Sequence, residues 1–253
     1  MEACPLILLW GGVTGFEPEL CKTHPLPMLL PIYYRDEHCL VVDKPSGLPI
    51  HKNAHLAHDA PYLTKLLGDH LGQWVYNVHR LDAKTSGLVL LALSPEAARN
   101  LTQQFEQRRV EKIYHAILKG DPGQGCWEEP VLDRKKGKRK PARTDYRALE
   151  SVLTPLKSKD RSPVSLCLTE LRPYTGRWHQ LRQHCAYHRF DIVGDTQHGD
   201  WTLNRLITEA TGSNRLLLHA QSLAFDHPQT GERMVVRSEH PVEFRQVLDH
   251  WCK

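Results

Sequence analysis

The chain has 253 residues, of which 40% are hydrophobic and 25% are charged, so it is long enough to bury the core of one large domain or two small ones. Its net charge of +4 decides nothing about partners, but no apolar run approaches the roughly 20 residues that a membrane-spanning helix needs, which excludes a membrane protein. The seven cysteines are scattered without a C-x-x-C pair, which argues against a disulfide framework and predicts a cytoplasmic protein.

The N-terminal segment differs from the rest of the chain. Residues 1–27 show neither helical nor strand periodicity and contain four prolines, so we expect a loose extension there. Residues 28–253 carry patterned sequence and are expected to form one domain. The apolar runs MLLPIYYRD and HCLVVDK predict two strands joined by a polar turn. Leucines at helical spacing then predict a helix over residues 60–72.

A buried strand and a helix follow. The run GLVLLAL at 87–93 is almost continuously apolar, which is typical of a strand buried on both faces. Ser94 is a suitable N-cap for the next helix, and Arg108 and Arg109 are expected at its negative C-terminal end. The alternation in EKIYHAILKG predicts a further strand over residues 111–120.

The C-terminal half continues the mixture of strands and helices. The predicted elements are strands at 143–153 and 165–173, a loop and helix at 175–189, a short strand and turn at 191–200, a hairpin at 214–236 and a helix at 239–251. Because many strands and few helices occur without regular βαβ alternation, we expect an α+β fold built on a mixed sheet.

Two segments carry unusual polar clusters. Asp82 lies between the basic pair His79-Arg80 and a Thr-Ser-Gly turn, just before the buried strand. Taken alone, an aspartate at such a position is more often a turn residue that accepts backbone hydrogen bonds. Arg177 and Arg182 crowd the start of the helix at 175–189. This cluster is either an exposed polar face or a site for a phosphate or carboxylate.

Five motifs together indicate a family. They are, in chain order, D-K-P-S-G, H-R-L-D-x-x-T-S-G, K-I-Y-H-A, T-G-R-x-H-Q-L-R and G-D-x-x-H-G. From about Met28 to its C-terminus, the chain resembles the RluA family of pseudouridine synthases. The segments TQHGDWTLNR and LLLHAQSLAFDHPQTGE are most similar to the tRNA pseudouridine synthase C branch. The resemblance implies a largely antiparallel mixed sheet flanked by helices, with a catalytic cleft across the sheet.

The resemblance also implies a reaction. It indicates an isomerase that flips a uridine out of RNA and rearranges its glycosidic bond, at uridine 65 in the acceptor stem region of tRNA or, alternatively, in ribosomal RNA. Asp82 corresponds to the essential aspartate, whose carboxylate attacks C1′ or C6 or removes the C2′ proton; the sequence leaves these three routes open. One acid suffices because the base never departs, whereas a glycosidase needs two.

Further active-site residues are carried over from the same motifs. Arg182 matches the last arginine of the helix motif and is the implied ion-pair partner that keeps Asp82 ionised inside a pocket. Tyr114 matches the tyrosine that stacks on the target base or takes the C5 proton. Arg80 is expected to fill the space left by the flipped base or to contact its phosphate. The family needs no metal or organic cofactor, and we expect a monomer.

RNA binding is expected to be largely electrostatic. The run RKKGKRKPAR at 134–143 holds seven Lys and Arg and no acid; it is either an RNA contact or a solvated loop. Arg177, His179, Lys84 and Lys44 are the other residues expected to contact RNA.

Two rival functions remain. A zinc site would use His184 and His188, four residues apart on one helix, with Cys185 between them, although no H-E-x-x-H or cysteine pair accompanies them. The second rival is a non-catalytic RNA-binding module on the same fold. Replacement of Asp82 distinguishes this module from an enzyme, because only an enzyme would lose activity.

Overall fold

The computed structural model describes residues 30–52, 57, 59–133, 137–157 and 162–252. The helices are α1 Leu63–Leu71, α2 Pro95–Glu106, α3 Gln180–Tyr187, α4 Trp201–Thr211 and α5 Val242–Asp249. The strands are β1 Ile32–Arg35, β2 Cys39–Lys44, β3 Tyr76–Asn77, β4 Ser86–Ala92, β5 Glu111–Lys119, β6 Gln124–Trp127, β7 Val131–Asp133, β8 Lys138–Lys140, β9 Thr144–Lys157, β10 Pro163–Pro173, β11 Leu218–Asp226 and β12 Arg233–Arg237.

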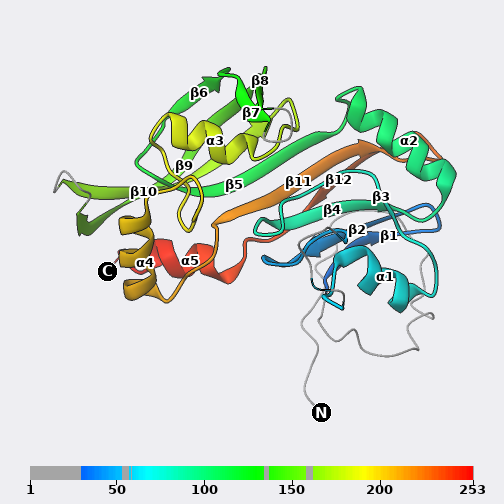
Figure 1. Ribbon diagram of the computed structural model, residues 1–253, viewed down its shortest axis with the longest axis horizontal. Helices are drawn as coiled ribbons and strands as arrows, with labels where there is room; N and C mark the ends of the chain where they lie inside the picture. Colours follow the sequence, from blue (N-terminus) through cyan, green and yellow to red (C-terminus); the bar gives the residue numbers. More distant parts are fainter. Residues whose placement is uncertain (1–29, 53–56, 58, 134–136, 158–161, 253) are drawn as a thin grey trace, which may run out of the picture.

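One long sheet organises the described part of the chain (Figure 1). Its main strand order is β1-β2-β4-β11-β5-β10-β9-β6, with β3 paired to β4 and β12 paired to β11. Of the pairs within this sheet, β4 and β11 run parallel and the others run antiparallel. Strands β7 and β8 form a separate hairpin. This topology confirms the predicted α+β fold with a mixed, largely antiparallel sheet.

Side-chain alternation along β2 decides which helix covers which face of the sheet. Leu40 and Val42 pack in the cluster that contains the buried leucines of α1, whereas Cys39 and Val41 pack with α2. Because successive residues of a strand point to opposite faces, α1 and α2 lie on opposite sides of the sheet. Helix α3 packs in one further cluster, and α4 and α5 share another. Figure 1 shows α2 and α3 together above the sheet, with α1, α4 and α5 below it.

Strand β4 confirms the prediction of a doubly buried strand, since all seven of its residues are buried. Gly87 within it has a φ of 111°, and a Cβ atom there would lie 2.4 Å from the backbone of Ala220 on β11. Only glycine therefore allows the parallel pair to approach this closely. A single turn joins Asp82 to the start of β4. The pairing of β4 with β11 therefore fixes the end of the turn that carries Asp82.

The structure corrects the predicted end of α2. Ser94 caps the helix as predicted, because its side chain accepts a hydrogen bond from the Ala97 backbone N–H. The helix ends at Glu106, so Arg108 and Arg109 lie beyond its last turn. Arg108 adopts a left-handed conformation with a φ of 58°, which ends the helix and turns the chain toward β5.

The strand predicted in residues 191–200 is wrong, and the helix that follows was not predicted. Ile192 makes a single bridge to Leu118 instead of a strand, because the chain turns at Gly194. Helix α4 was not predicted from the sequence. It begins after the N-cap Asp200, whose carboxylate accepts hydrogen bonds from two backbone N–H groups. The predicted extension at 1–27 lies outside the described residues, and the single domain stays a prediction. No helix of the described residues is both long and apolar enough to cross a membrane.

Candidate active site

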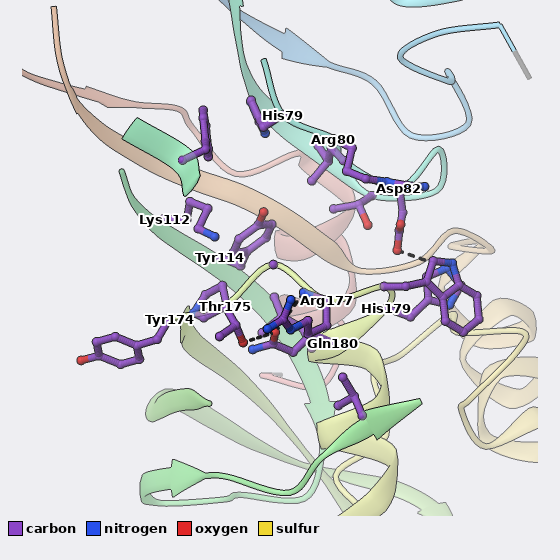
Figure 2. Close-up of a pocket in the computed structure, with 18 of the residues that line it drawn as sticks. His79, Arg80, Asp82, Lys112, Tyr114, Tyr174, Thr175, Arg177, His179 and Gln180 are labelled. Carbon is purple, nitrogen blue, oxygen red and sulfur yellow. Dashed lines mark hydrogen bonds and ion pairs between the residues drawn. The ribbon is translucent and has the colours of Figure 1, made fainter. Parts of the chain in front are cut away.

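A cleft of about 840 Å³ opens on the face of the sheet that carries α2 and α3. Its walls are the segment before β4, the end of α2, strand β5 and the loop that leads from β10 into α3. The cleft brings together six of the eight predicted site residues: Asp82, Arg80, Tyr114, Arg177, His179 and Arg182. Figure 2 shows the side chains of Asp82 and His179 next to each other, joined by a dashed line.

The turn that carries Asp82 is held by the segment after β2. The Gly47 backbone N–H donates to the carbonyl of Ala83 at 2.7 Å, and the Ser46 hydroxyl donates to the carbonyl of Lys84 at 2.6 Å. The Lys44 ammonium donates to the same Ala83 carbonyl at 2.9 Å. The D-K-P-S-G motif therefore supports the turn of the H-R-L-D motif.

One of the predicted RNA contacts, Lys44, is wrong. Its side chain is completely buried, and its ammonium also donates to the carbonyl of Pro45. Burial and the nearby charge of Arg215 lower the pKa of Lys44 to about 7. Lys44 therefore cannot reach an RNA phosphate, because its hydrogen bonds are directed into the protein toward the turn that positions Asp82.

His79 fixes the other side of this turn. Its Nε2 accepts a hydrogen bond from the backbone N–H of Leu90 at 2.9 Å, and its ring stacks on Phe105 of α2. Burial lowers the pKa of His79 to about 3, so the imidazole is neutral and retains this acceptor. The histidine of the H-R-L-D motif therefore joins the segment before Asp82 to β4 and α2.

Arg182 lies beside Asp82, but its strongest hydrogen bonds go to Asp195. Its Nε and Nη2 donate to the two carboxylate oxygens of Asp195 at 2.7 Å each, whereas its Nη1 lies 3.6 Å from Oδ2 of Asp82. Asp195 is held in turn by the backbone N–H groups of Gln197 and His198. Asp195 thus anchors the guanidinium of Arg182. The predicted ion pair with Asp82 is a second, longer contact of the same guanidinium.

His179, which the sequence predicted as an RNA contact, is an internal residue of the site with a mostly buried side chain. Its backbone is left-handed, with a φ of 49°, and its ring stacks on Trp178. Its Nε2 accepts from Arg182 at 3.0 Å and lies 3.4 Å from Oδ2 of Asp82. Because arginine can only donate, the neutral imidazole carries its proton on Nδ1 and donates to His198. Both ring nitrogens are therefore engaged, and neither is available to a phosphate.

Opposing effects act on the ionisation of Asp82. Desolvation raises its pKa above the ordinary value of 3.8, while the charges of Arg182 and Arg80 act in the opposite direction. The carboxylate side chain keeps 23% of its surface exposed to the cleft. Across the cleft, burial and the charge of Asp82 raise the pKa of Tyr114, so its phenol stays protonated. The site therefore combines a reactive acid with a neutral aromatic face.

The remaining predicted RNA contacts lie at the edges of the site. Arg80 is exposed and points into the cleft, and Arg177 lines the opposite wall with its Nε 3.3 Å from the carbonyl of Pro141. Lys84 is exposed and donates to the hydroxyl of Thr196, outside the cleft lining. Residues 134–136 of the basic run fall in an undescribed gap, while the following residues form β8 of a hairpin beside the cleft.

The proposed zinc residues have protein partners. The two ring nitrogens of His184 lie within hydrogen-bond distance of the Thr144 hydroxyl and the Glu129 carbonyl. His188 Nε2 lies 2.8 Å from the carboxylate of Glu129. The one cluster with metal-ligand spacing in the described part of the chain is elsewhere, at Asp36, Cys39 and His227. There the backbone N–H groups of Gln229 and Thr230 hydrogen-bond to Nδ1 of His227, leaving its Nε2–H to donate to Asp36.

Sequence reasoning missed two residues of this site. Asp195 was visible as the acid of the G-D-x-x-H-G motif, but its partner lies thirteen residues away on α3. Lys112 lines the cleft two residues before Tyr114 on β5, a separation that places both side chains on one face of the strand. That spacing was the available signal for Lys112.

Comparisons with known proteins agree with this geometry. A family model described as RNA pseudouridylate synthase matches residues 38–187. The tRNA pseudouridine synthase C of Vibrio parahaemolyticus is 38% identical over 239 residues, covering 88% of this chain and 95% of that protein. The protein of the same name from Pasteurella multocida is 40% identical over 220 residues, covering 83% of this chain and 90% of that protein.

Two solved human structures share the fold. Human RNA pseudouridylate synthase domain containing 4 aligns with a TM-score of 0.67 at 27% identity, covering 88% of this chain and 93% of that one. Human RNA pseudouridylate synthase domain containing 1 aligns with a TM-score of 0.68 at 28% identity, covering 88% of each chain. The fold implied by the sequence motifs is confirmed.

Proposed function

Because the chain belongs to the RNA pseudouridylate synthase family, we propose that it converts a uridine of tRNA to pseudouridine and that Asp82 is its essential acid. The observation that supports this most directly is the Asp82 carboxylate, which is partly open to the cleft and faces an anchored guanidinium. The relatives named tRNA pseudouridine synthase C support tRNA as the substrate over ribosomal RNA. Uridine 65 stays the predicted position.

The reaction breaks the N1–C1′ bond of uridine and joins C5 to C1′, so C5 loses a proton and N1 gains one. Attack at C1′, attack at C6 and proton removal from C2′ all require Asp82 in its ionised form. The charges of Arg182 and Arg80 favour that form, against the effect of burial. The arrangement therefore supplies a charged carboxylate in a partly desolvated site, which all three routes need.

Tyr114 is proposed to stack on the flipped uracil. An aromatic face offsets part of the few kcal/mol that unstacking a base costs. The raised pKa of Tyr114 favours this stacking role over action as a phenolate base toward the C5 proton. Arg80, exposed at the mouth of the cleft, is placed to occupy the gap that the flipped nucleotide leaves.

Mapping pseudouridine in total RNA tests the substrate. RNA from cells with and without the gene is compared, and purified protein is incubated with an unmodified tRNA transcript. We expect loss of one tRNA pseudouridine in the deletion strain and its formation by the protein in vitro. Loss confined to ribosomal RNA would reject tRNA as the substrate. Absence of any change, with no product in vitro, would favour a non-catalytic RNA-binding module.

The pH dependence of the rate tests the role of Asp82. Because only the ionised carboxylate acts and burial raises its pKa, the single-turnover rate is expected to rise with pH around a midpoint above the ordinary value of 3.8. Arg80 lowers this pKa, so Arg80→Met should move the midpoint to higher pH. The measurement uses saturating RNA. A midpoint at or below 3.8 would contradict the assignment.

The cellular setting follows from the proposed substrate. A tRNA-modifying enzyme is proposed to act in the cytoplasm as a monomer, without a metal or organic cofactor. The charges that act on Asp82 are those of Arg182, Arg80 and Lys44. Sedimentation of the purified protein would measure its oligomeric state.

A further inference from the structure

Lys112 is a cation in the cleft without a counter-ion among the described residues. It lies on β5, and its side chain is mostly buried. Figure 2 shows the side chains of Lys112 and Tyr114 next to each other, both pointing into the cleft. No carboxylate of the described part of the chain lies within ion-pair distance of its ammonium, and the charge of Arg108 acts on it. Burying an unpaired cation costs free energy, and an anion bound beside Lys112 would offset this cost.

The neighbouring groups make this position more positive. Burial and the charge of Arg108 lower the pKa of Lys112 to about 8, and the charge of Lys112 helps to keep His79 neutral. Arg108 lines the same cleft and, like Lys112, has no ion-pair partner among the residues that the structure describes. Its left-handed backbone is uncommon for a residue other than glycine.

The opposite wall of the cleft completes the site. A Cβ atom on Gly176, in the loop that leads into α3, would lie 3.9 Å from Nζ of Lys112. The lysine therefore spans the cleft from β5 to this loop. Arg177 follows in the same loop and also lines the cleft. An anion bound here would meet cations from three separate elements.

We propose that Lys112 and Arg108 form a subsite for a backbone phosphate of the RNA strand beside the target uridine. The proposal rests on the proposed function, because the phosphate belongs to the strand whose uridine enters the cleft. Two unneutralised cations match a phosphate better than a neutral carbonyl of a base. Tyr114 lies between Lys112 and Asp82 in Figure 2, so a base stacked on this tyrosine would direct its backbone toward the subsite.

Lys112→Met tests the subsite because it keeps the length of the side chain and removes its charge. We expect roughly tenfold weaker binding of an unmodified tRNA transcript. The slope of log Kd against log salt concentration should fall by about 0.7 to 0.9, which corresponds to one lost phosphate contact. Lys112→Arg should restore affinity, and Lys65→Met on α1, across the sheet, is the matched control.

Synthetic RNAs with one neutral methylphosphonate linkage near the target uridine identify the phosphate. The linkage that weakens binding to the wild-type protein should weaken binding to Lys112→Met less, because Arg108 still contacts this phosphate in the variant. An unchanged Kd and salt slope in Lys112→Met, with a folded protein, would overturn the subsite while wild-type activity still supported the proposed function. A reduced saturating rate with unchanged affinity would also overturn it. No product from wild-type protein would instead reject the proposed function itself.

Discussion

Asp82→Asn is expected to abolish pseudouridine formation while RNA binding survives. The amide has nearly the same shape as the carboxylate but cannot attack carbon or accept a proton from C2′. We expect the single-turnover rate on tRNA to fall by at least about 10³-fold, within the range of about 10² to 10⁴ that a lost acid or base usually costs. The dissociation constant should change by less than about threefold, because phosphate contacts dominate RNA affinity. Product is measured by pseudouridine mapping, and affinity by titration.

The unfolding temperature of Asp82→Asn provides the control, because it shows whether the variant is folded. Desolvation raises the pKa of Asp82, so the folded state holds the proton more tightly than the unfolded chain does. The stability due to this shift is present at acidic pH and is lost as pH rises through the raised pKa. At neutral pH, Asp82→Asn should therefore unfold at the same temperature as the wild-type protein or a higher one. Retained pseudouridine formation would reject Asp82 as the essential acid, and a lower unfolding temperature would contradict the electrostatic argument.

The H-R-L-D segment could be predicted from the sequence because its information is local. Asp82, the Thr-Ser-Gly turn and the apolar strand lie within a dozen residues, and each step follows from backbone rules for turns and buried strands. The helix that carries Arg182 was likewise predicted from a contiguous motif. The roles of Asp82 and Arg182, in contrast, came from the resemblance to the family, and the structure brings the two side chains to 3.6 Å.

The partners of these groups could not be predicted, because they depend on contacts between distant segments. Lys44 is an ordinary lysine in the sequence, but the carbonyl of Ala83, 39 residues away, accepts its hydrogen bond inside the protein. Asp195 belongs to a turn whose geometry needs Gly194, where any Cβ atom would collide with the backbone of Arg215. Burial changed the role of each residue, and burial is a property of the assembled fold.

Arg182→Met should destabilise the protein more than any other substitution in the site. It leaves Asp195, whose side chain is 1% exposed, as a buried charge without its guanidinium. Breaking a buried pair in this way costs about 3–5 kcal/mol of unfolding free energy. The sequence motifs paired Arg182 with Asp82, but the structure attributes most of this cost to Asp195. Urea denaturation at neutral pH measures the loss, and pseudouridine formation should fall together with it.

A second substitution separates stability from catalysis at this pair. Asp195→Asn keeps an oxygen for the backbone N–H groups of Gln197 and His198 but removes the buried charge. The double variant Arg182→Met/Asp195→Asn should therefore recover most of the lost unfolding free energy, yet remain inactive because no guanidinium faces Asp82. Recovery of both would show that Arg182 acts through folding alone.

Acid should narrow the stability difference between the wild-type protein and Arg182→Met. In the wild-type protein, Arg182 and two backbone N–H groups lower the pKa of Asp195 to about 2. The stability that this shift supplies is present above the ordinary value of 3.8 and is lost as pH falls toward 2. In the variant, burial without the guanidinium raises the same pKa, so protonation relieves the unpaired charge. If the loss of unfolding free energy in Arg182→Met were the same at neutral pH and at pH 4, the cost would come from lost packing. A proton can neutralise an unpaired charge, but it cannot restore packing.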